Sequence, residues 1–385
     1  MGSFIKIKNL RLKNYRNHKD IKVKPEKNII VIYGKNGSGK TNILESISLL
    51  DSTNGLRNVN LFEVVSDKLK GPIELFGSNF ELETESSIVN VGLGLKKTNE
   101  NFTKILNINN SKASKSALKN ELSIFWVVPK MSYLFQNSSE DRRTFIDMMI
   151  NSIDKEHLEN ISKYLKFKKE RIKILKRTNF ENDSAWLDTI EKKMCNFGMI
   201  ICDSRRTFLK SLNRKLNIIN NKISKFLLEF NGTIDQLLKK EPALHVEQFF
   251  LKSLKQNRFK DSISGRTNFS ANKTDLIAYD EVTKKEAKNF STGEQKLIVI
   301  SIILSFIEHL QTVKKIGLIF LLDDVFSYLD KSYIIKLITK LNELSIQTWI
   351  TDVRGDFIEN DNPLSEIIHK INIGDKGFKV QDIKI

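Results

Sequence analysis

Apolar residues alternate with basic ones over residues 4–23, and this period of two predicts short β-strands. Residues 28–33 form a compact apolar run typical of a buried strand, and a glycine-rich loop follows it. Residues 42–50 carry apolar side chains at helical spacing. Alternation returns over residues 72–108 and predicts an antiparallel sheet, whereas residues 124–128 predict another buried strand. The first third of the chain is therefore expected to mix α and β structure.

The middle of the chain has a different pattern. Residues 111–120 are polar and predict a loop, but from residue 139 to 255 the apolar side chains fall three or four positions apart. This segment is expected to be almost wholly helical, with one long amphipathic helix, or two in tandem, over residues 186–227. After residue 265 the α/β pattern returns, with helices expected over 290–310 and 333–344 and strands over 316–322 and 347–351.

These patterns divide the chain into an α/β domain made of two separate segments and a helical insertion. We expect the α/β domain to comprise residues 1–138 and 256–385, and the helical lobe to comprise residues 139–255. The length of 385 residues is enough for a core of two or more layers.

Charge points to the kind of partner. The formal net charge is +17, and residues 160–225 hold seventeen Lys or Arg against six Asp or Glu. An excess of positive charge on a helical segment favours a surface that binds polyanions. We expect this surface to bind DNA or another partner. A solvated helix face, or a genome whose codons favour Lys, Asn and Ile, explains part of the same excess.

Cysteine content and hydropathy bear on the compartment. The two cysteines, Cys195 and Cys202, lie seven positions apart in one predicted helix and are too far apart to bridge each other. No secretory signal and no membrane-spanning apolar run is found, so we expect a cytoplasmic protein without a membrane partner. The ATPase subunit of a transporter is not excluded by this test.

The strongest motif is a phosphate-binding loop between the predicted strand 28–33 and the helix that follows. It fits G-x-x-x-x-G-K-[ST] and comprises Gly34, Lys35, Asn36, Gly37, Ser38, Gly39, Lys40 and Thr41. The glycines allow backbone N–H groups to face phosphate oxygens, Lys40 should reach the β- and γ-phosphates, and Thr41 should ligate Mg²⁺. We expect these residues and Asn42 to bind ATP, with Lys40 also assisting catalysis.

A second motif is a pair of acids at the end of a buried strand. Asp323 and Asp324 follow the run Leu-Ile-Phe-Leu-Leu, and unpaired buried charge is costly. We expect Asp323 to hold Mg²⁺, directly or through water, and Asp324 to orient the attacking water. A helix cap is the alternative function for one of the two acids.

A third motif precedes the helix expected over 290–310. Its residues include Ser291, Gly293 and Gln295, and a hydroxyl next to free N–H groups at a helix start offers a second phosphate contact. Taken by itself, the segment fits a capping box better than a phosphate contact.

The order of these motifs resembles ABC-type ATPases. The phosphate loop comes first, then the S-T-G-E-Q segment, which resembles the ABC signature, then Asp323-Asp324, then S-Y-L-D ending at Asp330, which resembles a D-loop. The resemblance implies an ABC-type ATPase head with a helical insertion. It also implies a homodimer that closes on ATP, with Ser291, Gly293, Gln295 and Asp330 contacting nucleotide.

Within this superfamily the chain resembles the RecF family of bacterial recombination mediators. The resemblance rests on the N-terminal L-R-L-K-N-Y-R-N, on W-V-V-P-K-M-S-Y-L-F at residues 126–135, and on the R-R-T-F-I-D stretch at residues 142–147. It implies an ATP-dependent protein of replication and repair that binds DNA at duplex and single-strand/double-strand junctions and helps to load recombinase. RecR and RecO are the implied partners, the location is cytoplasmic at the nucleoid, and hydrolysis would be slow, acting as a switch.

Some positions depart from the family pattern or stay open. A G-P-H-R-like segment is replaced by residues 270–273, which read S-A-N-K, and no switch His stands at Thr351-Asp352. Arg16 is a candidate nucleotide contact or a plain surface residue, and Gln136 is a weak Q-loop candidate.

Three other functions compete with DNA repair. A Rad50- or SMC-type head lacks the required coiled-coil arms here, and a nuclease-linked ATPase needs a further acidic metal-binding domain. A transporter-type subunit would act on a protein or membrane partner without binding DNA, and the basic helical segment argues against it.

Overall fold

The structure, a computed structural model, describes residues 4–51, 55–57, 75–98, 101–114, 116–119, 122–177, 180–216, 226–310, 317–324, 331–355 and 363–374. The chain forms two compact units. Unit 1 comprises Met1–Ser132 with Leu310–Ile385, and unit 2 comprises Tyr133–His309. The expected helical lobe, residues 139–255, falls inside unit 2, which extends beyond it at both ends.

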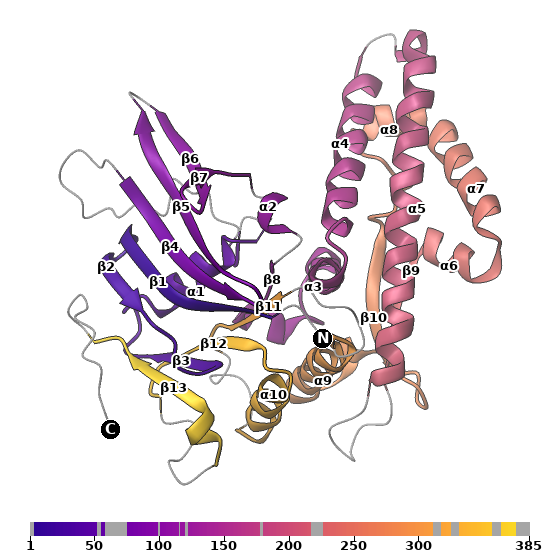
Figure 1. Ribbon diagram of the computed structural model, residues 1–385. Coiled ribbons are helices and arrows are strands. Elements are labelled where there is room, and N and C mark those ends of the chain that lie inside the picture. Colours follow the sequence, from indigo (N-terminus) through magenta and orange to yellow (C-terminus); the bar gives the residue numbers. More distant parts are fainter. Residues whose placement is uncertain are drawn as a thin grey trace. The chain divides into compact units, whose positions relative to one another are not determined.

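Unit 1 contains an antiparallel sheet of six strands in the order β2-β1-β4-β5-β6-β7 (Figure 1). Its strands are β1 (Ile5–Tyr15), β2 (His18–Val23), β4 (Leu75–Thr84), β5 (Ile88–Thr98), β6 (Asn101–Ile108) and β7 (Ser111–Lys112). Alternate side chains of β1 are buried, which accounts for the alternation in its sequence. The antiparallel sheet expected over residues 72–108 is confirmed for its described residues.

The second sheet of unit 1 is parallel, in the order β13-β3-β12-β11-β8. Its strands are β3 (Ile29–Tyr33), β8 (Leu122–Val127), β11 (Gly317–Leu322), β12 (Gln347–Asp352) and β13 (Ile368–Asn372). Strands β3, β8, β11 and β12 are buried along nearly their whole length, which explains their continuous apolar sequences. Their carboxyl ends meet at one edge, where ligands bind in sheets of this kind.

Helix α1 (Lys40–Ser48) lies between the two sheets and packs against β1, β8 and β12. The side chain of Gln347 also joins the sheets, because it accepts a hydrogen bond from Ile7 N at 2.8 Å and donates one to Ile7 O at 2.9 Å. Two further helices are α2 (Ser116–Lys119) and α10 (Lys331–Glu343), and α10 packs against β12.

Unit 2 is mainly helical. Its helices are α3 (Ser139–Ile153), α4 (His157–Leu175), α5 (Ser184–Lys215), α6 (Thr233–Lys240), α7 (Ala243–Gln256), α8 (Arg258–Ser264) and α9 (Thr292–Leu310). Helices α4 and α5 run side by side (Figure 1), and α7 packs on α5. Gly198 permits this packing, since a Cβ there would lie 2.7 Å from the ring of Phe250.

One interpretation of the middle segment is wrong. Residues 226–232 form strand β9 (Phe226–Gly232), which pairs antiparallel with β10 (Thr274–Asp280), so the helical pattern does not extend to Leu227. The pairing with β10 decides this, because it supplies the backbone hydrogen bonds that a helix would otherwise make internally. The predicted loop over residues 111–120 also contains two short elements, β7 and α2.

Candidate nucleotide site

The predicted phosphate loop joins β3 to α1 at the carboxyl edge of the parallel sheet. Two of its glycines are required by their surroundings. Gly34 has φ +151° and a Cβ there would lie 2.4 Å from Ile373 O, while Gly39 has φ +101° and a Cβ there would lie 2.5 Å from Asn17 and His18. The loop therefore holds a shape that L-residues with side chains rarely adopt.

Lys40 folds back over this loop. Its Nζ donates hydrogen bonds to Gly34 O at 2.5 Å and to Lys35 O at 3.0 Å. Burial lowers the pKa of the Lys40 ammonium, and the nearby carboxylates of Asp324, Asp352 and Asp323 oppose that shift. The Lys40 side chain is thus held over the loop, close to these carboxylates, where its ammonium group can bind an anion.

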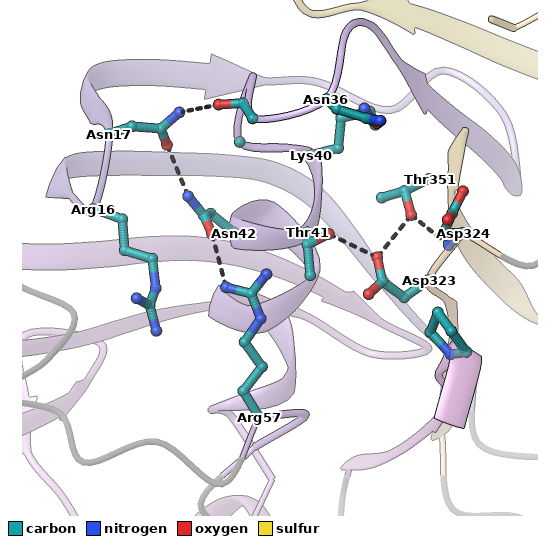
Figure 2. A pocket seen from close by; sticks show the side chains of 13 residues that line it. Arg16, Asn17, Asn36, Lys40, Thr41, Asn42, Arg57, Asp323, Asp324 and Thr351 are labelled. Atoms are coloured by element: carbon teal, nitrogen blue, oxygen red, sulfur yellow. Dashed lines mark hydrogen bonds between the residues drawn. The ribbon is translucent and has the colours of Figure 1, made fainter. Parts of the chain in front are cut away.

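The acidic pair lies beside the loop, at the end of β11. Asp323 Oδ1 accepts hydrogen bonds from Thr41 Oγ1 at 2.9 Å and from Thr351 Oγ1 at 2.8 Å (Figure 2). Asp324 has the unusual φ of +48°, and its N–H donates to Thr351 Oγ1 at 2.8 Å. Thr351 therefore orients both acids, and the sequence analysis assigned it no such role.

Residues of the turn between β1 and β2 also form hydrogen bonds with the phosphate loop. Asn17 Nδ2 donates to Gly37 O at 3.3 Å, and Asn42 Nδ2 donates to Asn17 Oδ1 at 2.8 Å. The ring of His18 contacts Gly39 O through Nε2 at 3.1 Å. Burial lowers the pKa of His18. The N-terminal L-K-N-Y-R-N-H stretch thus supports the loop directly.

Glu45 of α1 gathers two arginines at the pocket. Its buried carboxylate accepts two hydrogen bonds from Arg16, at 2.7 and 2.9 Å, and one from Arg57 at 3.3 Å. Arg16 has φ +48°, a backbone conformation that costs energy outside glycine and is retained here at the pocket wall. Of the two possibilities for Arg16, its position favours the nucleotide contact.

The described residues of unit 1 enclose a pocket of about 520 Å³. Nine of the residues singled out from the sequence line it, and its full lining is Arg16, Asn17, Asn36, Gly37, Gly39, Lys40, Thr41, Asn42, Arg57, Pro129, Asp323, Asp324 and Thr351. Gly34, Lys35 and Ser38 belong to the loop without lining the pocket. Four lining residues had no site role assigned from the sequence. Asn17 and Pro129 lie in segments that had been used only for the family resemblance, whereas Arg57 and Thr351 reach the pocket through loop packing and strand order.

The residues present fit a nucleotide with Mg²⁺. Ser38 Oγ is buried and makes no hydrogen bond within the described part of the chain, and a Cβ at Gly37 would meet no atom within 4 Å. A phosphate group could accept a hydrogen bond from the Ser38 hydroxyl and occupy the open space beside Gly37. Thr41 and Asp323 supply two hard oxygens, and Mg²⁺ is commonly bound by few protein oxygens together with substrate phosphates and water.

In unit 2, the segment expected to act as a signature begins α9. Ser291 Oγ accepts from Glu294 N at 3.3 Å, and Glu294 Oε2 accepts from Ser291 N and from Ser291 Oγ, both at 2.8 Å, so the two residues form a capping box. A Cβ at Gly293 would meet nothing within 4 Å, whereas buried Gln295 donates to Phe290 O at 3.0 Å. The space beside Gly293 is thus open to a ligand, whereas the Ser291 hydroxyl would have to leave Glu294 to contact one, and Gln295 stabilises the preceding loop. Asp330 lies outside the described residues.

The R-R-T-F-I-D stretch begins half-buried at the surface of unit 2 and ends in its interior, where Phe145, Ile146 and Asp147 are buried. Arg142 forms a two-point ion pair with Asp275 of β10 at 2.7 Å, and Arg143 donates to Thr274 O at 2.6 Å. Asp147 forms a two-point ion pair with Arg205 of α5 at 2.7 and 2.8 Å. The stretch therefore ties α3 to β10 and α5.

The segment that departs from the family pattern also packs inside unit 2. Tyr164 Oη lies 2.8 Å from Ser270 Oγ and accepts a hydrogen bond from Ala271 N at 2.9 Å. Burial raises the pKa of Tyr164. Gln136 is exposed.

Comparison with known proteins agrees with this architecture. The sequence model of the family described as RecF/RecN/SMC N terminal domain matches residues 6–373. Two solved structures are similar over 97% of this chain: the recombination mediator protein RecF with ATPrS (TM-score 0.80, 21% identity, 97% of that chain) and RecF with ATP (TM-score 0.75, 23% identity, 98% of that chain). An Smc head domain from Pyrococcus furiosus has a TM-score of 0.51 at 15% identity, over 96% of this chain and 94% of that chain. The expected α/β ABC-type ATPase head is thus confirmed.

Relatives at higher identity identify the family. The DNA replication and repair protein RecF of Rickettsia typhi is 35% identical over 358 residues, which cover 91% of this chain and 95% of the relative. That of Rickettsia akari is 34% identical over 93% of this chain and 97% of the relative. Across the described residues, no helix is both long and apolar enough to cross a membrane. The similarity along nearly the whole chain shows that it belongs to the RecF family.

Proposed function

We propose that this chain is an ATP-switched DNA repair protein, which binds ATP with Mg²⁺ in the unit 1 pocket, pairs with a second copy around the nucleotide and holds DNA in that state. The observation that carries the proposal is the hydrogen bonding of Thr41 and Thr351 to one oxygen of Asp323, beside a lysine folded over a phosphate loop. This arrangement brings a phosphate-binding loop and an acidic pair to one place.

Each residue of the pocket has a distinct task in this proposal. Lys40 would leave the carbonyls of Gly34 and Lys35 for the β- and γ-phosphates, because a phosphate is a stronger partner for an ammonium group than a carbonyl. Thr41 and Asp323 would hold Mg²⁺, which offsets phosphate charge when it is bound. Asp324 would orient the attacking water.

Pairing with a second copy would complete the site. A helix start offers free N–H groups and a positive dipole end, and Ser291 adds a hydroxyl at the beginning of α9. By its resemblance to ABC-type ATPases, such a segment would lie against the nucleotide of the partner subunit. We therefore infer an ATP-dependent homodimer in which Ser291 and Gly293 contact the γ-phosphate of the opposite site.

DNA would bind to basic helices of unit 2. On α4, Lys166, Lys169 and Lys173 are exposed and fall at intervals of three and four residues, so that they lie on one stripe of the helix. Lys176, the residue that follows the helix, is exposed and continues the stripe. A line of cations without a base-reading motif is suited to phosphate contacts.

The finer features come from the family. Related proteins are named for DNA replication and repair, and the solved ones are called recombination mediators of a RecFOR pathway. We infer that this chain acts at gaps and at single-strand/double-strand junctions in the cytoplasm, near the nucleoid. RecR and RecO would be its partners in loading recombinase, and slow hydrolysis of ATP would release it from DNA.

The test is fluorescence anisotropy of a labelled gapped duplex titrated with the protein, with and without ATP and Mg²⁺, at two salt concentrations. We expect ATP to tighten binding and salt to weaken it steeply, because phosphate contacts release counterions. Binding that is absent, or that ignores ATP, would contradict the proposal.

Two variants make the test sharper. Lys40→Ala should remove both ATP binding and the effect of ATP on DNA affinity, since it deletes the phosphate cation. Asp324→Asn should keep ATP binding, slow hydrolysis by at least about a hundredfold and lengthen the life of the ATP dimer, which sedimentation would report. A Lys40→Ala protein that still dimerises with ATP would overturn the assignment of this pocket.

A further inference from the structure

The short helix α8 of unit 2 buries an acidic side chain and exposes its apolar side chains. Asp261 is fully buried, whereas Phe259 is 67% exposed and Ile263 is 73% exposed. Successive residues turn about 100° around a helix, so each of the two apolar side chains lies about 160° from Asp261. A surface helix ordinarily buries its apolar stripe and exposes its acids. Here the apolar stripe faces solvent, and this requires a reason.

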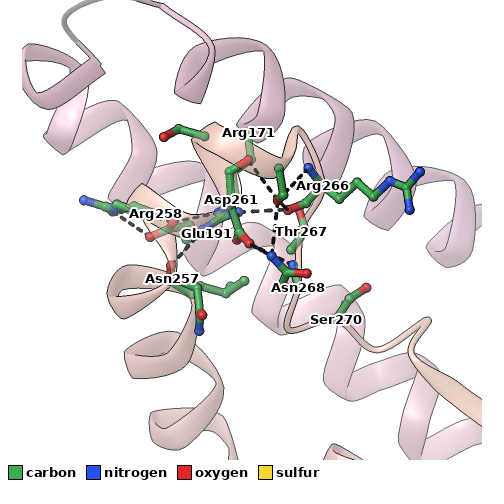
Figure 3. Close-up of polar contacts among 12 residues, drawn as sticks. Arg171, Glu191, Asn257, Arg258, Asp261, Arg266, Thr267, Asn268 and Ser270 are labelled. Carbon is green, nitrogen blue, oxygen red and sulfur yellow. Dashed lines mark hydrogen bonds and ion pairs between the residues drawn. The ribbon is translucent and has the colours of Figure 1, made fainter.

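A buried ionic network forces this orientation (Figure 3). Arg171 of α4 pairs with Asp261 at 2.7 Å and with Glu191 of α5 at 2.8 Å, and all three side chains are fully buried. Arg171 Nη2 also donates to Leu254 O at 2.7 Å. Turning α8 to hide its apolar stripe would strand buried charges, which costs several kcal/mol.

Both ends of α8 are fastened as well. At its start, Arg258 Nη2 pairs with Glu191 at 2.6 Å and with Asp188 at 2.5 Å. At its end, Gly265 adopts the left-handed conformation with φ +63°, and Asn268 donates twice to Asp261 Oδ1, at 2.8 and 2.9 Å. Helix α8 is therefore a rigid support that presents Phe259 and Ile263 outward.

Basic residues flank this apolar pair along the chain. Residues 248–274 contain six Lys or Arg but a single acid, the buried Asp261. Lys260 and Arg266 are exposed next to the apolar pair in sequence, and Lys252 is exposed on α7. Lys255, also exposed, pairs with Asp188 at 3.0 Å and adds less to this charge. We call the exposed side chains Phe259, Lys260, Ile263 and Arg266 the α8 face.

We propose that the α8 face is a docking site for a protein segment that carries large apolar side chains flanked by Asp or Glu. An apolar centre with a charged rim is typical of protein interfaces, and the basic rim selects an acidic partner. Nucleic acid fits less well, because Ile263 offers no ring for base stacking and the cations flank the centre instead of filling it. Two anchoring side chains suit a short segment rather than a broad surface.

A peptide screen tests this site through the chemistry that it selects. The full chain is immobilised and a random 12-residue peptide library displayed on phage is selected against it. We expect the enriched peptides to carry net negative charge and at least two large apolar residues. Affinities of fluorescein-labelled copies are then measured by anisotropy for the wild type and for variants.

The variants separate apolar and charge contributions. Phe259→Ser combined with Ile263→Ser should weaken peptide binding at least about thirtyfold, because two anchors lose their buried area. Lys260→Glu should weaken it at least about fivefold, with less salt dependence than the wild type. Val282→Ser is the matched control, since Val282 is 76% exposed elsewhere in unit 2 and its replacement should leave affinity unchanged. Lys40→Ala should also bind normally, which separates this site from the nucleotide proposal.

Several outcomes would overturn the proposal. One is a selection that yields no peptide dependent on Phe259 and Ile263, or only basic peptides. Another is a double variant that keeps its melting temperature and binds peptide within about threefold of the wild type. If the double variant instead loses a labelled single-stranded oligonucleotide, or self-association measured by sedimentation, the occupant is nucleic acid or a second copy, and the acidic segment is rejected.

Discussion

The ion pair between Asp147 and Arg205 gives a quantitative test of how the R-R-T-F-I-D stretch stabilises unit 2. Arg205 is 2% exposed and forms two hydrogen bonds to Asp147, which is 8% exposed. His157, which is fully buried, lies with Nε2 2.9 Å from the same carboxylate. We consider Arg205→Met, which keeps an unbranched apolar side chain but removes the charge, together with the cation–π contact of the guanidinium with the ring of Phe230.

The expected cost is large because it leaves a carboxylate buried without its main cation. Breaking one partner of a buried pair costs about 3–5 kcal/mol. Unit 2 (Tyr133–His309) falls in the size range of about 150–250 residues. In that range each kcal/mol of lost stability lowers the melting temperature by about 2–4 °C. We therefore expect unit 2 to melt about 6–20 °C below the wild type. Lys163→Met, which removes an exposed pair with Glu159, should cost less than about 1 kcal/mol and serves as the control in the same unit.

The assay is thermal and urea unfolding followed by far-ultraviolet circular dichroism, which the helices of unit 2 dominate. Adding Asp147→Asn to Arg205→Met should restore at least about half of the lost stability, because it removes the stranded charge while the amide oxygen can still accept from His157. A double variant as unstable as Arg205→Met alone would refute the reasoning, since the uncompensated charge would then not be the cause.

The effect should also depend on pH. Burial alone would raise the pKa of Asp147, but Arg205 and His157 outweigh it, so that pKa lies below its ordinary value of 3.8. The contribution of this pair is therefore present above pH 3.8 and is lost as pH falls through the lower, folded-state pKa. The stability gap between wild type and Arg205→Met should shrink in acid. The shrinkage starts as pH falls through the pKa of Asp147 in the variant, which burial without Arg205 raises. A gap that widens in acid would contradict the assignment.

Further predictions concern the pocket and the thiols. Thr351→Val should weaken Mg²⁺-dependent ATP binding at least about tenfold, because it removes the hydrogen bonds to Asp323 and from Asp324 N. Thr351→Ser should restore binding, and titration with a fluorescent ATP analogue with and without EDTA would check both. Burial raises the pKa of Cys195 to about 12 and also raises that of Cys202, so neither thiol should react with iodoacetamide in the native protein at pH 8, and both should react in guanidinium. Intact-mass measurement decides this, and rapid native labelling of Cys202 would count against its burial.

The contiguous parts of the candidate site could be recognised from the sequence alone. The phosphate loop and the Asp323-Asp324 pair each lie next to a buried strand, and an all-apolar run marks such a strand wherever it pairs. Local chemistry and spacing were enough there. Thr351 was not recognisable in the same way, because it reaches Asp323 only through the order β3-β12-β11, which no local pattern encodes.

Strand β9 shows where local pattern is ambiguous. Its apolar side chains follow a long helix, and its identity as a strand depends on backbone pairing with β10, which lies more than forty residues later. Two periodicities, helical and alternating, can both be read from a short apolar run. The sequence therefore predicted the fold class but not the boundary of the helical segment.

The sequence by itself determined that this is a two-part α/β and helical chain with an ATPase-type phosphate loop, because motif chemistry is local and covalently ordered. Only the tertiary structure decided which charges are buried. In the folded chain Asp261 is buried and Phe259 is exposed. Asp147 pairs with Arg205, although more than fifty residues separate them in sequence. Desolvation depends on all the neighbours of a group at once, so burial of a charge follows from packing and not from the order of residues.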